Sequence, residues 1–393
     1  MTLSGIGRSL DERAFAALLA TVFAIAFSIA LGQACAAVCL LLFMAGTLKG
    51  QIRLRCPGVM IPALVFITLA VVLSGIHGGW HGLWGRTGKL GWFVLVPVVT
   101  SLASAPERGR KLILAFLAGS AVLGLKDVVW YPFKAWQHPA PDFLTSLIDK
   151  GSMTDGQMLM LGTVGSVLLI LMAIREGRRV PWWGWVIMAA QVAGLLINFK
   201  RGSWFCAIVL MGIAILTTLR WRAWVMAVAI LAGILMLPPV QSRLGQLKRE
   251  FNVEEGGRLT MWFKIAPVLI REQPGGLGYG CLTNDRMKQV YRRVEPNRNH
   301  LHANWAQVLV ETGWLGLLVY LAWMGTALWD GGAWVRRTRA ALPSDRGPPW
   351  VAFALLAGLL LNGLVEYNFG DTELMLIYAF VMGVIGAGAR ASA

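Results

Sequence analysis

Residues 14–48 read AFAALLATVFAIAFSIALGQACAAVCLLLFMAGTL, an apolar run without a single charged side chain. One helix that spans a bilayer needs only about 20 such residues, because the hydrocarbon core is about 30 Å thick. The run is therefore too long for one span, and the Gly32-Gln33 pair predicts an interruption inside it. We expect two helices that cross a membrane in opposite directions and are joined by a very short turn.

The rest of the chain has the same composition. Of its 393 residues 56% are hydrophobic and only 14% are charged, and the mean hydropathy is +0.61. Soluble domains carry about 25% charged residues, so this composition is typical of a protein with many membrane spans. The sequence therefore predicts an all-α integral membrane protein. The first apolar segment lacks a small-residue cleavage site, so we interpret it as a retained span.

Apolar runs of membrane-spanning length divide the chain into three parts. We expect nine spans in residues 1–240, a long extramembrane loop with short amphipathic helices in residues 241–305, and three spans in residues 306–393. The twelve predicted spans are 14–31, 33–48, 58–76, 89–105, 112–130, 156–174, 182–199, 203–219, 223–240, 306–329, 350–367 and 373–389.

The basic residues predict the orientation, because Lys and Arg of short loops stay on the cytoplasmic side. With the N-terminus inside, 18 of the 36 basic residues fall on the tails and the short cytoplasmic connections. Seven fall in short connections outside, and eleven lie in the segment 241–305, which is long enough to cross regardless of its charge. Both termini are thus predicted to be cytoplasmic and the long loop extracytoplasmic.

The long loop has an excess of five positive charges, which favours an anionic partner on the outer face. Most of its charged residues can also be explained as solvated faces of short helices or as contacts to lipid headgroups. Within it, the stretch RLTMWFKIAPVLIRE (258–272) has apolar residues at helical spacing on one side. We expect this stretch to form an amphipathic helix that lies against the membrane plane.

The sequence lacks the motifs of several kinds of chemistry. The sequence has no phosphate-binding loop of the P-loop type, no Cys/His cluster with zinc spacing and no Asp-x-Asp pair. Asp371-Thr-Glu373 is the nearest approach to a metal site and lacks evident further ligands. The five cysteines are scattered, which disfavours a structural disulfide. We therefore expect no metal, no cofactor and no nucleic acid among the ligands.

Ionisable residues at the outer ends of spans are the candidate site residues, because burial there is costly. Lys200 and Arg201 occupy the very short turn in NFKRGSWF (198–205), and Arg258 follows two glycines in GGRLTMW. His300 and His302 stand directly before the tenth predicted span.

Each candidate also has a structural interpretation. Lys200 and Arg201 could reach lipid phosphates, and Arg258 could pair with Glu254 or Glu255 in the same loop. The histidines could fill a hydrogen-bonded position at the interface. Glu311, deep in the tenth predicted span, is expected to accept a hydrogen bond that fixes helix packing.

Three stretches together resemble the signature blocks of the O-antigen ligase and polymerase superfamily. They are RGSWF (201–205), GGRLTMWFKIAPVLIREQPGGLGYG (256–280) and HLHANWAQVLVETGWLG (300–316). Their order and spacing carry the resemblance, since each block alone is weak.

The histidine block separates the two histidines. The ligase signature is His, then Asn, Ser or Gln, then nine residues, then Gly-x-x-Gly. His302 has this spacing to the Gly-x-x-Gly of residues 313–316, and His300 does not. Ala303 departs from the amide or hydroxyl of the signature, and Asn304, one place further on, is a candidate to replace that polar group.

The resemblance implies a GT-C-like glycosyltransferase of the bacterial inner membrane, with its active site on the periplasmic face. The donor would be an undecaprenyl-diphosphate-linked O-antigen and the acceptor a sugar hydroxyl of lipid A-core, with membrane lipids around both. It implies that His302 is the general base and that Arg201 and Arg258 bind the diphosphate. The reaction would be a single inverting displacement without a metal.

Four further residues are predicted to contact substrate. They are Arg86, Lys89, Lys200 and His300. An O-antigen polymerase or a protein-glycosylating ligase shares the same blocks and stays an alternative. A flippase for lipid-linked oligosaccharides is a second alternative, although its ionisable groups are expected near the midplane between repeats.

Overall fold

The computed structural model describes residues 9–84, 86–137, 146–147, 151–218, 232–233, 236, 241, 245, 252–254, 257–294, 299–338 and 343–391. Throughout these ranges the regular elements are helices. Six of them are long and apolar enough to cross a membrane, and three shorter apolar helices accompany them. The described residues have the architecture of an all-helical multi-pass membrane protein, as predicted. The predicted count of twelve spans is not confirmed.

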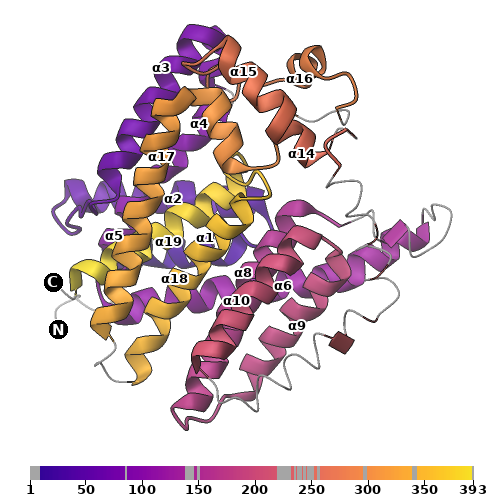
Figure 1. Ribbon diagram of the computed structural model, residues 1–393. Coiled ribbons are helices and arrows are strands. Elements are labelled where there is room, and N and C mark those ends of the chain that lie inside the picture. The colour runs from indigo at the N-terminus through magenta and orange to yellow at the C-terminus, as the bar shows by residue number, and fades with distance from the viewer. Residues whose placement is uncertain are drawn as a thin grey trace.

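The helices form a bundle with a small helical cap at one end, made of residues 252–254 and 257–294 (Figure 1). The elements are α1 (Leu10–Ala24), α2 (Ile29–Leu48), α3 (Met60–Trp84), α4 (Arg86–Lys89), η1 (Leu90–Val94), α5 (Leu95–Leu102), α6 (Pro106–Gln137), α8 (Met153–Arg175), α9 (Trp182–Asn198), α10 (Arg201–Thr218), α14 (Arg258–Thr260), η2 (Met261–Ile265), α15 (Ala266–Glu272), α16 (Asn284–Val290), α17 (Asn304–Arg337), α18 (Pro343–Gly363) and α19 (Thr372–Ala391). The predicted ninth span, 223–240, lies almost wholly outside the described residues.

The first apolar run forms two helices, but the predicted position of the break is wrong. The chain turns between Ala24 and Ile29, where the Ser28 side chain accepts a hydrogen bond from the Leu31 amide and caps α2. Gly32 lies inside α2, where an added Cβ would come within 3.0 Å of Ile25. This glycine therefore permits close packing of the two helices and does not end one of them.

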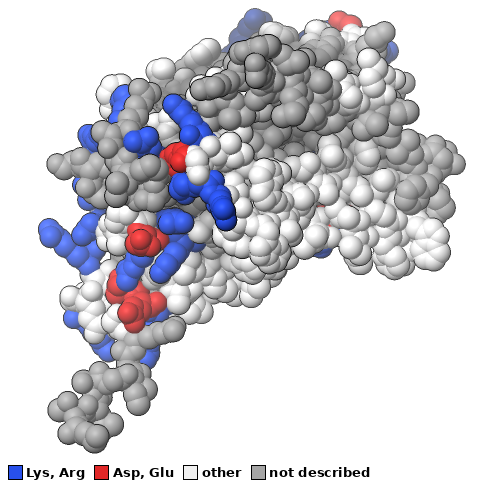
Figure 2. Space-filling view, turned by 90° about the horizontal axis from the view of Figure 1, so that it is seen from below, with Lys and Arg blue, Asp and Glu red and all other residues white. Residues whose placement is uncertain are grey.

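The outer surfaces of the bundle fit a bilayer. On α3 the side chains of Ile61 and Ile76 are 72% and 68% exposed, while Phe66 on the same helix is fully buried. Such a face has no counterpart in water-soluble helices, which turn their apolar side inward. Figure 2 shows Lys and Arg gathered on one side of the molecule seen from below, beside a broad uncharged surface.

The helix α17 is interrupted at Gly313, where φ is 68° and ψ is −174°. The interruption leaves backbone carbonyls without helical partners, and the loop of residues 275–278 supplies donors to them. The amides of Leu277 and Gly278 donate to the carbonyls of Val310 and Glu311 at 3.0 and 2.9 Å. The glycines of two distant sequence blocks thus meet at one junction, and an added Cβ on Gly313 would lie 2.6 Å from the Pro274 carbonyl oxygen.

Residues 258–272 are helical, as predicted, through α14, η2 and α15. The middle part, η2, is a π-helix. Its last hydrogen bond runs from the Ala266 amide to the Met261 carbonyl. Pro267 follows directly and lacks an N–H, so the normal α-helical bond to Phe263 is impossible there.

The expected placement of this helix on the membrane plane is wrong in one respect. Its apolar face is buried in protein, because Met261, Ile265 and Leu269 are at most 1% exposed. They pack on a core that includes Leu301 and Val310 at the start of α17. The amphipathic pattern therefore reflects a folded cap on the bundle, which lies at the upper right in Figure 1.

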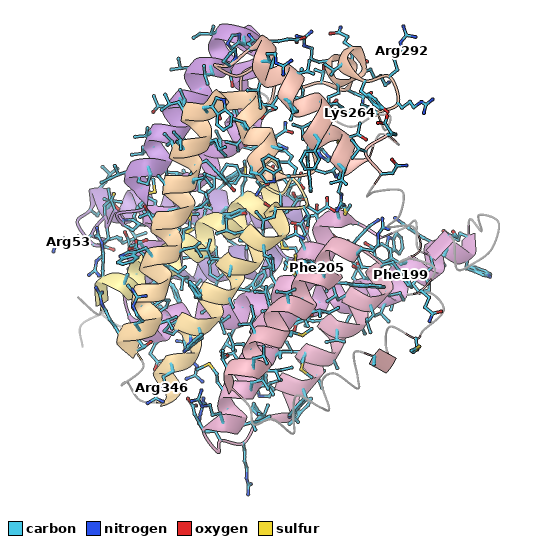
Figure 3. The ribbon with its side chains drawn as sticks, viewed as in Figure 1. Arg53, Phe199, Phe205, Lys264, Arg292 and Arg346 are labelled. Atoms are coloured by element: carbon cyan, nitrogen blue, oxygen red, sulfur yellow. The ribbon has the colours of Figure 1, made fainter. Side chains whose placement is uncertain are left out.

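Charged residues mark both ends of the bundle. Figure 3 shows Lys264 and Arg292 on the cap and Arg346 at the opposite end of the view. Lys264 pairs with Glu254 on the cap, and this hydrogen bond lowers the pKa of the Glu254 carboxyl. The last turns of α17 and α19 lie together, because the Arg337 guanidinium donates to the Ala389 carbonyl at 2.8 Å.

Candidate active site

The candidate site forms where the cap meets the connection between α18 and α19. In this connection Glu366 is 4% exposed, and Asn368 and Phe369 are fully buried. The Glu366 amide donates to the Asn362 carbonyl at 2.8 Å, which continues the last turn of α18. A buried carboxylate therefore stands at the end of a helix, where its charge needs partners.

Glu366 has two of the predicted site residues as partners. Its Oε1 forms an ion pair with the Arg258 guanidinium, and its Oε2 lies 3.3 Å from Nδ1 of His302. His302 is 5% exposed. Among the described residues the carboxylate beside Arg258 is that of Glu366, whereas Glu254 pairs with Lys264; Glu255, the other partner considered for Arg258, lies outside the described residues. The carboxylate joins a residue of the cap to a residue at the start of α17.

The backbone of His302 has an uncommon conformation. Its φ is 52°, and the only other described non-glycine residue with a positive φ is Phe199. Such conformations cost about 1–3 kcal/mol and cluster at functional sites. The His302 amide lies 3.3 Å from Nδ1 of His300, whose ring centroid is 4.4 Å from that of His302 and 5.7 Å from that of Tyr367. His300 thus packs directly against the candidate base.

Arg201 begins α10 beside the same carboxylate. An added Cβ on the next residue, Gly202, would lie 3.4 Å from Oε1 of Glu366. The preceding Phe199 is left-handed, with φ of 55°, which lets α10 begin almost directly where α9 ends. The N-terminus of a helix attracts anions through its unpaired amides and its dipole. Arg258, His302 and the first turn of α10 therefore surround Glu366.

The other predicted residues have different surroundings. Lys200 packs toward the start of α8, because an added Cβ on Gly156 would lie 3.2 Å from the Cβ of Lys200. Lys89 donates to the Gly370 carbonyl at 2.9 Å, so it anchors the connection that carries Glu366. Arg86 begins α4, but its side chain lies outside the described residues.

Asn304 holds this connection in place. Its Oδ1 accepts from the amides of Asn368 and Phe369 at 2.9 and 3.1 Å, and its Nδ2 donates to Oδ1 of Asn368 at 2.7 Å. Tyr279 of the cap donates to the Phe369 carbonyl at 2.6 Å. The polar group one place after Ala303 is thus a clamp that fixes the position of Glu366.

Replacing Asn304 by alanine is expected to destabilise the protein and loosen this connection. Each buried group left without a hydrogen bond costs about 1–3 kcal/mol. Thermal unfolding and hydrogen exchange of residues 364–371 measure the two effects. Gln191→Ala is the control, because Gln191 is equally buried and donates at 2.8 Å to the Leu117 carbonyl, in another part of the bundle. Unchanged exchange of residues 364–371 in Asn304→Ala would refute the clamp.

Ala303 is the N-cap residue of α17, with φ of −158° and ψ of 136°, and no side chain caps the helix. The Asn or Ser of the family signature would supply an oxygen to the first free amides at this position. The departure at residue 303 is therefore a missing helix cap.

We expect Ala303→Ser to stabilise the protein by about 1 kcal/mol, the usual contribution of an N-cap hydroxyl. Ala306→Ser is the matched control, because both alanines are fully buried in the same core and Ala306 lies inside the helix. It is expected to lower the melting temperature. Equal effects of both substitutions on thermal unfolding would show that the cap is not the cause.

Sequence reasoning missed Glu366. The residue fell inside the predicted span 350–367, and an ionisable residue within a span is a signal of function. The same signal was used for Glu311, whose predicted hydrogen bond is confirmed. Glu311 is fully buried and its Oε1 accepts from Gln307 Nε2 at 2.7 Å and from the Leu282 amide at 3.5 Å.

A family model described as O-antigen ligase matches residues 186–321, a range that includes Arg201, Arg258 and His302. No curated protein matches the chain. The matched range ends before Glu366, so the carboxylate comes from the structure alone. Residues 186–321 are thus similar to the O-antigen ligase domain, which O-antigen ligases and O-antigen polymerases share.

Proposed function

We propose that the protein is an O-antigen ligase that transfers a glycan from undecaprenyl diphosphate to a sugar hydroxyl of lipid A-core on the periplasmic face of the inner membrane. The observation that carries the proposal is the single carboxylate of Glu366 between Arg258 and His302. It combines an anion-binding group and a proton acceptor within one buried cluster. The matched family domain supplies the class of substrate.

His302 is the general base of the proposed reaction. Imidazole exchanges protons near neutral pH, which makes histidine the commonest general base. With Nδ1–H donated to Glu366, Nε2 keeps its lone pair for the acceptor hydroxyl. Glu366 then stabilises the imidazolium that forms when the proton arrives. His300 packs on the imidazole and assists in orienting it.

Arg201 and Arg258 bind the diphosphate of the donor. Guanidinium groups stay charged in a low-dielectric site and offer paired donors to phosphate oxygens. The first turn of α10, beside Glu366, adds amide donors to the same place. Together they stabilise the charge that grows on the diphosphate as the glycosidic bond breaks. Lys200, Lys89 and Arg86 are the outer candidates for contacts with the phosphates of donor or acceptor.

The polyprenyl tail has an apolar surface next to these arginines. Phe205 lies one turn after Arg201 on α10 and is 57% exposed, and Phe263 lies five residues after Arg258 and is 66% exposed. Exposed aromatic rings beside an anion site are suited to a ligand with a charged head and an apolar chain. A donor anchored in the bilayer would thus reach the site from the side.

The proposed chemistry is one displacement at the anomeric carbon. The acceptor oxygen attacks as its proton moves to Nε2 of His302, and undecaprenyl diphosphate leaves on the opposite side of the sugar ring. The configuration inverts, through an oxocarbenium-like transition state and without a covalent intermediate. Because the donor is already an activated diphosphate and the sequence lacks an Asp-x-Asp pair, we assign charge neutralisation to the two arginines and not to a metal.

Deletion of the gene and analysis of lipopolysaccharide on a gel test the proposal. Loss of a ligase leaves bare lipid A-core while the diphosphate-linked polymer accumulates. Core that carries a single repeat would identify a polymerase instead, and lipid-linked units trapped on the cytoplasmic side would identify a flippase. Complementation with the wild-type gene must restore the full ladder.

A further inference from the structure

A second site lies between α6, α8, α9 and α18, far from Glu366. A cavity of about 170 Å³ opens there among the early turns of α6 and α9 and the last turns of α8. The candidate active site adjoins the opposite ends of α8 and α9, near Gly156 and Asn198. Ser166 is the cavity residue of α8 nearest to that end, and it lies ten residues from Gly156, about 15 Å along the helix axis. The cavity is therefore separate from the site of glycan transfer.

The walls of this cavity are apolar and its mouth is basic. Ile113, Leu117 and Ile170 line its interior, and Arg110, Arg178 and Arg179 line its mouth. Arg178 forms an ion pair with Glu176, so the two other arginines supply the excess charge. All three arginines are exposed.

Ser166 is a polar group in an otherwise apolar wall. Its side chain lines the cavity, its residue is 4% exposed, and its hydroxyl lacks a hydrogen-bond partner among the described residues. A buried hydroxyl without a partner is costly, and most such groups in proteins are satisfied. The cavity thus offers one hydrogen-bond donor at depth in addition to the charges at its mouth.

We propose that this cavity binds one anionic phospholipid of the leaflet on that side. One acyl chain lies along the apolar walls, the phosphate lies between Arg110 and Arg179, and Ser166 donates to an ester carbonyl. Apolar cavities of about 150 Å³ accept guests as large as benzene, so the space suits a segment of chain. Basic pockets between membrane helices are suited to anionic headgroups.

Two features favour a phospholipid over other anions. A free phosphate would gain nothing from the apolar walls. Trp183 lines the cavity, and it begins α9 together with Trp182; the two are 47% and 76% exposed, as tryptophans at the headgroup level of a bilayer are. The proposal is independent of glycan transfer, and it predicts binding whether or not the chain is a ligase.

Native mass spectrometry of the purified full-length protein tests this site. The protein is offered phosphatidylglycerol, phosphatidylcholine with the same chains, or undecaprenyl phosphate. We expect one phosphatidylglycerol to stay bound, with at least tenfold weaker retention of phosphatidylcholine. The double variant Arg110→Gln/Arg179→Gln and the cavity-filling variant Ser166→Leu are each expected to lower phosphatidylglycerol retention at least tenfold.

The matched control is Arg53→Gln/Arg55→Gln, which removes the same charge from exposed arginines that do not line the cavity. It is expected to bind phosphatidylglycerol like the wild type. Equal retention of the two phospholipids, or equal loss in both double variants, would overturn the proposal. Stronger binding of undecaprenyl phosphate that is lost in Arg110→Gln/Arg179→Gln would overturn the choice of a phospholipid, because binding at the candidate active site would survive this double substitution. Size-exclusion profiles check folding. If Ser166→Leu does not fold, Arg110→Gln/Arg179→Gln still tests the site.

Discussion

Replacing His302 is expected to lower the rate of glycan transfer by about 10²–10⁴-fold, the usual contribution of a general base. His302→Ala removes the proton acceptor but also places alanine at a φ of 52°, a conformation that costs alanine more than histidine. His302→Asn separates the two effects, because asparagine tolerates left-handed backbone and its amide can still donate to Glu366. Both variants are expected to lose the lipopolysaccharide ladder.

The measurement is the rate of transfer by purified protein from a diphosphate-linked donor to lipid A-core, together with the melting temperature. His302→Asn should melt close to the wild type while its kcat falls, which assigns the loss to chemistry. His300→Ala is the neighbouring control, and a smaller loss is expected because His300 contacts the imidazole without reaching Glu366. A full ladder from His302→Asn would exclude His302 as the base.

The sequence predicted the class of fold because helix formation in a membrane depends on local composition. Apolar runs must bond their backbone internally, so each long run becomes a helix. Local composition did not predict where helices break. Gly32 was interpreted as an interruption and is a packing contact, whereas Gly313 interrupts a helix because distant residues 275–278 bond to the exposed carbonyls.

The site was partly predictable for a related reason. Arg201, Arg258 and His302 stand out in the sequence as ionisable residues at the outer ends of spans that also fall within the signature blocks. The structure places Arg258, His302 and the residue after Arg201 around Glu366. Glu366 belongs to no block, and its role depends on contacts that span 64 and 108 residues of sequence. Such contacts follow only from the packing of α17, α18 and the cap. The same holds for Asn304, whose partners lie 64 and 65 residues away.

What covers the apolar face of residues 258–272 was not predicted from the sequence, for a physical reason. An amphipathic pattern reports that one side of a helix is buried, and it does not report what covers that side. The covering atoms are those of Leu282, Met287 and the start of α17. This arrangement places Arg258 at the beginning of a helix that is fixed to the protein, which an arginine that binds a leaving group requires.

Glu366→Gln is expected to lower kcat by about 10²–10⁴-fold through His302, and to change the KM for the donor by a smaller factor through Arg258. In serine proteases the same change of a carboxylate that orients the catalytic histidine lowers kcat by about 10⁴-fold, because the imidazole takes the wrong tautomer. Here the amide NH₂ would face Nδ1 of His302 or the Arg258 guanidinium, and either arrangement removes one acceptor. Glu366 is thus a positioning residue that acts through His302 and Arg258.

Three comparisons separate this role from a purely structural one. Glu366→Asp keeps the charge on a shorter side chain and is expected to recover part of kcat. Glu366→Ala removes the acceptor of the Arg258 guanidinium and of the His302 imidazole, and is expected to destabilise the fold by about 1–3 kcal/mol for each lost hydrogen bond. Glu311→Gln is the control, since Glu311 is also buried but bonds Gln307 away from the site. It is expected to lower stability and leave kcat within a few-fold. If kcat followed the melting temperature across all four variants, or if the Gln and Asp substitutions of Glu366 had equal activity, the carboxylate would be a packing residue, and the base would need another group to set its tautomer.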